Sequence, residues 1–352
     1  MIRGTRWWAA TAMLAIVMSA CVRPSTTGSS AQPAQLYGAA PTTPDVQSLL
    51  GDSNWWPGPP SFGVRPLDSA TMPFNEKFHV ITRFSHIGTA ETFDVEYTVW
   101  NSTASATTQM SNIQSSLGTP VTGTKAGDQT LYYGQTSSGG AAPYGTATFI
   151  RLGQIVITST LSLKDASPPV SKLGRIATRL VSRLKDVLSG KVKVAPLPGG
   201  DTSVLPPPGP DLTLLGSVEL PIEAVIVMLG FASPEALAGV LKTTGVDHIV
   251  FGDYALDNDT HMEVRAGVFG FITSQDADTW FNALRGSTRV DELGIATFYD
   301  DASGQYFSLF TAGAKGAILV CRSTSDLEAA SRACESPLSR VAPAWQGRLA
   351  TG

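Results

Sequence analysis

The chain has 352 residues, of which 43% are apolar and only 15% are charged, and its formal net charge is −4. So few charges exclude a highly charged disordered protein and a coiled coil. An acidic chain without a dense basic surface is not expected to bind nucleic acid. The length suggests about two domains.

The first 20 residues have the pattern of a secretory signal peptide. Arg3 and Arg6 precede an uncharged, mostly apolar run over 7–20, which is too short to span a bilayer. The run ends in the letters MSAC. This ending resembles the lipobox of bacterial lipoproteins, although Met18 stands where that motif prefers leucine. The resemblance implies cleavage before Cys21 and acylation of its sulfur, which anchors the protein at the extracytoplasmic face of the bacterial cell membrane. The alternative is an ordinary signal peptide that happens to end in cysteine.

Composition divides the remaining chain into four parts. Residues 21–42 hold few charges and many Ser, Thr, Pro and Ala residues, which predicts a flexible tether. Residues 194–210 are rich in proline and glycine, which favours a semi-rigid linker. The two remaining parts, 43–193 and 211–352, are each long enough to form a hydrophobic core of their own.

The parts 43–193 and 211–352 show the same order of predicted elements, α-β-β-α-β-β-β-α. Each begins with a capped helix, continues with two apolar strands and an amphipathic helix, and closes with three strands and a helix. We therefore predict the α+β class, with two tandem, duplicated, two-layer sandwiches of antiparallel sheet and helices on one face. Two unrelated α+β domains of similar periodicity are the alternative. The clearest predicted elements are strands 79–86, 93–100, 248–256 and 261–272 and helices 171–188 and 325–334.

The sequence contains no recognisable catalytic signature. It lacks the G-x-S-x-G and Walker motifs, and its four histidines form no H-x-x-x-H pair. The densest acidic cluster holds Asp253, Asp257 and Asp259 with His261, between two predicted strands. Asp and Asn at such places commonly form turns, and a divalent metal site is the alternative. We therefore expect no catalytic residue, no metal and no cofactor.

Four basic residues, Lys172, Arg175, Arg179 and Arg183, fall on one narrow face of the predicted helix 171–188. The ordinary interpretation is the solvated face of a packed helix. The alternative is contact with an anionic surface, either lipid headgroups beside the anchor or an acidic partner.

Two adjacent tryptophans, Trp55 and Trp56, precede a proline-rich segment. Side chains alternate along an extended chain, so one of the two is expected to pack inside and the other to be exposed. An exposed tryptophan near the tether would suit contact with a partner. The alternative is that a turn covers both.

Cys321 and Cys334 are predicted to form a disulfide. Once Cys21 is acylated they are the two remaining thiols, and pairs of thiols outside the cytoplasm usually join. Geometry is the objection, because a helix that ran straight back along its strand would carry Cys334 too far from Cys321. The bond therefore requires the helix to cross the strand or fold back.

On function, we expect a lipid-anchored extracytoplasmic binding or scaffold protein without catalytic activity. Its architecture loosely resembles the paired extracytoplasmic modules of bacterial lipoproteins, and the groove between the two parts would hold an unknown protein or a small apolar ligand. One alternative is a carrier of a lipid or other apolar ligand, which would use the apolar stretch 220–231. Another is a cell-envelope hydrolase that uses the region 253–261.

Overall fold

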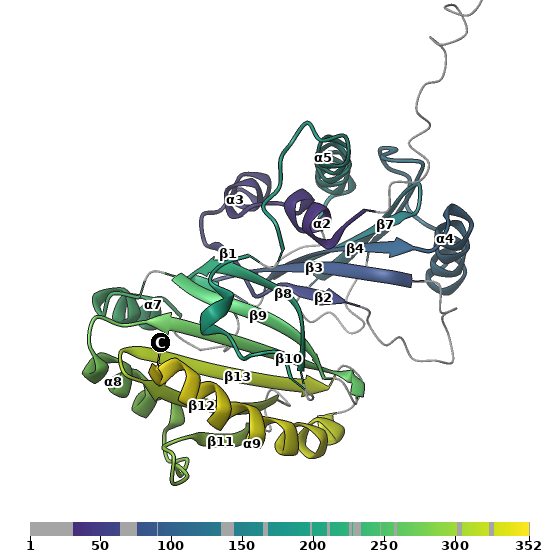
Figure 1. Ribbon diagram of the computed structural model, residues 1–352. Coiled ribbons are helices and arrows are strands. Elements are labelled where there is room, and N and C mark those ends of the chain that lie inside the picture. The colour runs from purple at the N-terminus through teal and green to yellow at the C-terminus, as the bar shows by residue number, and fades with distance from the viewer. Residues whose placement is uncertain are drawn as a thin grey trace, which may run out of the picture. The chain divides into compact units, whose positions relative to one another are not determined.

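From Pro33 onward, the described residues form two antiparallel sheets and the helices that pack on them (Figure 1). The predicted signal peptide and Cys21 lie outside the residues that the structure describes. Within the described ranges, no helix is both long and apolar enough to cross a bilayer. The structure, a computed structural model, describes residues 31–63, 76–89, 91–134, 144–164, 168–197, 199–209, 212–224, 227, 234–246, 248–256, 259–300, 305–323 and 327–351.

The first sheet has the strand order β1-β3-β4-β7-β6-β5, and β2 also pairs with β3. β1 and β2 share one edge of β3, with Trp55 opposite His86 and Ser61 opposite Ile81. All pairings in this sheet are antiparallel. The strands are β1 Trp55–Pro57, β2 Ser61–Gly63, β3 Glu76–His86, β4 Thr92–Trp100, β5 Gln129–Gly134, β6 Tyr144–Leu152 and β7 Ile155–Leu163.

The second sheet has the strand order β11-β12-β13-β10-β9-β8 and is also antiparallel. A register shift between Leu214 and Gly216 interrupts the pairing of β8 with β9. The strands are β8 Leu212–Pro221, β9 His248–Leu256, β10 Asp259–Gly270, β11 Ala296–Asp300, β12 Gln305–Ala312 and β13 Lys315–Ser323.

The two sheets have the same strand order once β8 is matched with the pair β1 and β2. The remaining strands then correspond in chain order, β3 with β9, β4 with β10, β5 with β11, β6 with β12 and β7 with β13. The predicted α+β class with two tandem antiparallel sheets is confirmed. We call residues 33–188 the first half and residues 212–351 the second half.

A capping box fixes where α3, in the first half, begins. Thr42 caps α3, and its side chain and backbone exchange hydrogen bonds with Asp45 in a capping box. α2, α3 and α5 lie over the same face of the first sheet (Figure 1). The helices are α2 Pro33–Ala39, α3 Thr43–Leu50, α4 Thr103–Leu117 and α5 Val170–Leu188.

The last helix of the second half is much longer than predicted. We predicted a helix over 325–334, whereas α9 spans Leu327–Thr351 and continues through Pro337 and Pro343. A proline inside a helix costs about 3 kcal/mol. The buried side chains of Leu338, Trp345 and Leu349 offset that cost by covering the sheet. The other helices of this part are α7 Pro234–Thr243 and α8 Ser274–Arg285, and a short 3-10 turn η1 occupies Thr202–Val204 in the linker.

The helices of the second half lie on both faces of its sheet, whereas we predicted helices on one face. Trp345 of α9 packs edge-on against Phe310 of β12, with ring centroids 5.1 Å apart. The next residue of that strand, Thr311, donates a hydrogen bond to Asp278 of α8 at 3.0 Å. Neighbouring strand residues point to opposite faces, so α8 and α9 cover opposite faces.

Candidate ligand-binding site

The two halves meet where β2 lies against β8 and β9. The backbone N–H of Phe62 donates to the buried carboxylate of Asp253, with a nitrogen-to-oxygen distance of 2.6 Å. The Phe62 ring also lies directly over Gly216, since a Cβ on that glycine would come within 2.5 Å of the ring. β2 is therefore paired with the first sheet and packed against the second.

A chain of charged side chains runs along this contact. Arg83 binds Asp94 through two hydrogen bonds of 2.9 and 3.1 Å. Arg265 pairs with Glu263 at 2.6 Å, and the hydroxyl of Ser61 contacts both. Burial lowers the pKa of Arg83. The hydrogen bond with Asp94 and the charges of Asp94 and Glu263 raise this pKa by more than burial lowers it, so the net shift is upward. These contacts across the halves hold both sheets in one unit.

The structure corrects the interpretation of the acidic cluster at Asp253. This residue lies inside strand β9, fully buried, and its carboxylate accepts the Phe62 N–H, so it is not part of a turn. Asp257 lies outside the described residues, and the side chains of Asp259 and His261 are likewise not described. In the described part of the chain, no three potential metal ligands come together.

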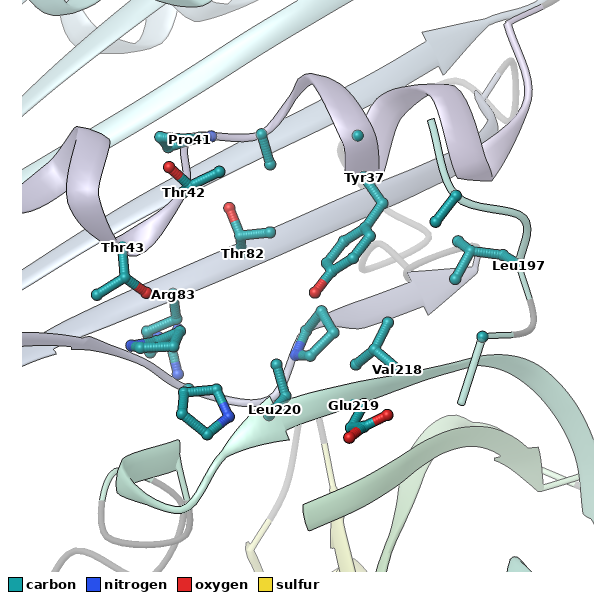
Figure 2. A pocket seen from close by; sticks show the side chains of 18 of the residues that line it. Tyr37, Pro41, Thr42, Thr43, Thr82, Arg83, Leu197, Val218, Glu219 and Leu220 are labelled. Carbon is teal, nitrogen blue, oxygen red and sulfur yellow. The ribbon is translucent and has the colours of Figure 1, made fainter. Parts of the chain in front are cut away.

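A pocket of about 480 Å³ opens beside this contact. Its walls come from α2 and the start of α3, from the β1–β2 segment, from β3, from the linker and from the outer edge of β8 (Figure 2). The volume is within the range of small-molecule sites. The lining is mostly apolar and rich in proline, and it includes Pro41, Pro57, Pro60, Phe84, Pro196, Leu197, Val218, Leu220 and Pro221.

Tyr37 places a hydroxyl in this apolar pocket. Its ring packs at a tilt against Phe62, with centroids 5.7 Å apart, and its phenol points into the pocket (Figure 2). Burial raises the pKa of Tyr37 to about 12, so it remains a hydrogen-bond donor at neutral pH. The hydroxyl makes no hydrogen bond with another described residue. It is therefore available to a ligand.

Most of the basic face on α5 is occupied by the chain's own backbone and side chains. Only Arg175 of the four residues is exposed without such a contact among the described residues. Contact with an anionic surface stays a prediction, and Arg183, half-buried, lines the pocket instead. Lys172 Nζ donates to the Leu50 carbonyl at 3.4 Å, Arg179 pairs with Asp45 at 3.1 Å, and Arg183 Nε donates to the Gly38 carbonyl at 3.2 Å.

The two tryptophans of β1 are treated differently by the fold. Trp55 is buried and packs edge-on against His86, with centroids 5.5 Å apart. Trp56 is half-buried. The alternation expected of an extended chain is thus present, and a partner contact through Trp56 stays a prediction.

The structure joins Cys321 and Cys334 in a disulfide, with alpha-carbons 5.9 Å apart. The geometric objection is resolved because α9 contacts β12, β13 and β10, which are neighbours in the sheet, so the helix lies across these strands and does not run back along β13 alone. Cys334 therefore lies above the end of β13. Both cysteines are fully buried, in the same core cluster as Leu338 and Trp345.

The sequence pointed to only a few of the residues that build the pocket, namely Arg183 on the basic face of helix 171–188 and Leu220 in the apolar stretch 220–231. Tyr37 lies in the segment that we predicted to be a flexible tether, yet α2 is a helix with Leu36 fully buried. Phe62 lies in a strand of only three residues. The proline-rich composition of 57–60 and 194–210 was the other available signal, and for 194–210 it indicated a linker rather than a pocket wall.

Comparisons with known proteins found a match only among solved structures. No protein-family model matches the chain, and no curated protein matches it. Among solved structures, it is similar to the extracellular domain of PknH from Mycobacterium tuberculosis, with 12% sequence identity and a TM-score of 0.34. The similarity covers 45% of this chain and 98% of that one. We base neither fold nor function on a similarity of this level.

Proposed function

We propose that this chain is an extracytoplasmic lipoprotein that binds a small ligand in the pocket between its halves. The observation that carries the proposal is the pocket itself. It has a volume of about 480 Å³, a mostly apolar lining and a few polar groups, including the phenol of Tyr37. Ligand sites in proteins commonly combine these features.

Two features support a place outside the cytoplasm. The buried Cys321–Cys334 disulfide suits an oxidising compartment. The N-terminal pattern that ends in Cys21 provides export and acylation. Acylation at Cys21 would keep the pocket close to the membrane surface.

Replacement of the lipid-accepting cysteine tests the anchor. Cys21→Ser should abolish incorporation of labelled palmitate and should either release the protein from the membrane fraction or leave the precursor uncleaved. Cys334→Ser serves as the control for a lost thiol and should keep the label. A cleaved, membrane-bound Cys21→Ser protein without label would show that the protein is not anchored in this way.

Filling the pocket tests the binding function. Leu197 lies on the linker wall, half-buried, and Leu197→Trp should occupy the space that a ligand needs. Native mass spectrometry of protein purified from its own envelope should show a bound mass with the wild type and none with this variant. Val121→Trp, at an exposed position away from the pocket, is the control and should keep the bound mass. A mass retained by Leu197→Trp would place the ligand elsewhere.

The apolar lining also favours the second candidate, a carrier of an apolar ligand. The prolines, Phe84, Leu197 and Leu220 would accept an acyl chain. Half of the predicted stretch 220–231 lies outside the described residues, and Leu220 and Pro221 of the described half line the pocket. Extraction of the bound molecule by organic solvent separates the two candidates, because a lipid passes into the solvent and a polar ligand does not.

A further inference from the structure

The β8 wall of the pocket presents unpaired backbone groups. In an antiparallel ladder, residues alternately direct their backbone N–H and C=O toward and away from the neighbouring strand. The Ser217 carbonyl accepts the Gly199 N–H from outside the sheet at 2.7 Å, and Pro221 has no N–H to give to β9. Glu219, midway between them, therefore directs its backbone N–H and C=O outward as well. Within the described ranges, neither group has a hydrogen-bond partner.

The linker leaves just this position open. Gly199 occupies the edge of β8 at Ser217, and Gly200, with a positive φ of 73°, continues over the sheet face, where a Cβ would lie 3.6 Å from both the Glu219 nitrogen and Val250 Cγ1. Beyond it, the edge from Val218 to Pro221 forms the pocket wall. The side chains of Val218 and Leu220 are buried on the pocket side, and the Glu219 side chain is exposed on the other face. One pair of backbone groups is thus available beside two apolar side chains.

The opposite wall supplies positive charge. Arg183 donates through Nε to the Gly38 carbonyl at 3.2 Å and forms no ion pair with any described carboxylate. Its two terminal nitrogens are therefore not engaged by an acid. Arg83, which also lines the pocket, is neutralised by Asp94 at 2.9 Å. The carboxylate of Glu219, although this residue lines the pocket, lies on the other face, so Arg183 is the charged lining residue without an acid partner in the described ranges. Its charge favours an anionic group on the ligand.

We propose that the pocket binds a short peptide in extended conformation with a free carboxyl terminus. Its backbone pairs with Glu219 on the edge of β8, its apolar side chains lie among the prolines and Phe84, and its carboxylate meets Arg183. A peptide carbonyl accepts a hydrogen bond from the hydroxyl of Tyr37. This inference rests on the proposed binding function and adds the class of ligand.

The exposed backbone groups are the reason to prefer a peptide over an acyl chain. A fatty acid would satisfy Arg183 and the apolar lining, but it would cover the N–H and C=O of Glu219 and the hydroxyl of Tyr37 without pairing them. Each buried polar group left unpaired weakens binding. A peptide in extended conformation satisfies all three, as in other cases of strand addition to a sheet edge.

The test uses the mature chain with Cys21→Ser, so that no acyl chain of its own competes for the pocket. The probe is a pool of acetylated tetrapeptides with free carboxyl termini, built from alanine, valine, leucine, phenylalanine and proline. A second pool is identical but amidated at the C-terminus, and decanoate is the third probe. Equilibrium dialysis with mass spectrometry identifies the retained members and gives their Kd values. We expect retention from the free-carboxylate pool, at least tenfold weaker retention of the amides, and weak competition by decanoate.

Three variants assign the contacts of the best retained peptide. Glu219→Pro removes the outward N–H, and proline is tolerated at edge positions whose N–H faces away from the ladder. Glu219→Ala keeps that N–H and is its control. We expect about tenfold weaker binding for the proline variant relative to the alanine variant. Arg183→Gln should weaken free-carboxylate peptides about tenfold or more and leave the amides unchanged, whereas Arg175→Gln on the same helix should have no effect. Tyr37→Phe should weaken binding about threefold to tenfold.

The outcomes separate this inference from the function on which it rests. Retention of decanoate in preference to every peptide would overturn the peptide assignment and leave a carrier of apolar ligands. Equal binding by the Glu219→Pro and Glu219→Ala variants would also overturn it, provided that thermal unfolding curves show both variants to be folded. No retention of any peptide at millimolar concentration would do the same, while the palmitate and envelope experiments would still decide the anchor and the pocket.

Discussion

The bond between Cys321 and Cys334 closes a loop at the end of the second half. The two residues are 13 positions apart, and their sulfurs are buried beneath α9. In the chain-entropy model, a loop of this length stabilises the fold by about 3 kcal/mol. We predict that Cys321→Ala with Cys334→Ala lowers the free energy of unfolding by about this amount, measured in urea.

The control for that prediction is the redox state of the unchanged protein. Reductant should lower the urea midpoint of the wild type toward that of the double variant and leave the double variant unmoved. Alkylation of two free thiols in protein taken directly from the envelope would show that the bond does not form there.

Asp45 links two helices and gives a pH dependence. Burial raises the pKa of Asp45. Hydrogen bonds from Thr42 and Arg179 lower it by more than burial raises it, so the net value lies below the usual 3.8. A lowered pKa stabilises the fold above the unfolded value, and this contribution disappears as pH falls through the folded value. Asp45→Asn should therefore cost about 1 kcal/mol at pH 6, and the difference from wild type should shrink below about pH 4.

The measurement is urea unfolding of both proteins from pH 6 to pH 3. Glu292→Gln, at an exposed loop position, is the control and should leave stability unchanged across the range. A difference between Asp45→Asn and wild type that stays constant with pH would contradict the ionic part of this explanation.

At the scale of elements, the short strand β2 joins the halves through a close approach. Gly216 of β8 leaves no room for a side chain, because a Cβ would lie 2.5 Å from the Phe62 ring. Gly216→Ala should therefore force the halves apart or displace the ring, at a cost of about 1–3 kcal/mol in thermal or urea unfolding. Gly270→Ala is the matched control, since a Cβ at Gly270 meets nothing within 4 Å. Equal stability of the two variants would show that this contact is looser than the structure indicates.

The elements with strong periodicity were predictable, and the short ones were not. Helix 171–188 and strand 248–256 agree with α5 and β9 to within a residue, because a wide apolar stripe or a long apolar run decides each. β1 and β2 have three residues each, too few to show a period; β1 ends in Pro57, and Pro60 comes directly before β2. Their existence depends on pairing with β3, which is a tertiary effect that local sequence does not contain.

At the scale of the whole molecule, the linker joins two halves that also touch directly. The contacts of Phe62 with Asp253 and Gly216, and of Ser61 with Arg265, do not pass through the linker. A protease site inserted within 201–209 should therefore yield two folded fragments that still elute together in size-exclusion chromatography. Arg265→Met should weaken that association. Two fragments that separate fully on cleavage would show that the linker alone holds the halves together.

The pocket could not be predicted from the sequence for a related reason. Its walls come from segments as distant as Tyr37, Arg83, Arg183 and Leu220. The sequence drew attention to Arg183 and to the stretch that contains Leu220, but nothing in it showed that the four segments meet. The topology brings them together, because β8 and the β1–β2 pair occupy equivalent edges of the two sheets. The sequence predicted a groove between the two parts but did not name the residues that line it.

The edge that β8 fills with one strand is filled in the first half by two short strands, separated by residues 58–60. Pro57 and Pro60 at this break line the pocket. A proline cannot donate to the ladder, so the edge opens there. If both halves descend from one ancestral module, the proposed ligand site lies at the edge where the two copies differ, because one copy builds this edge from a single strand and the other from two short strands.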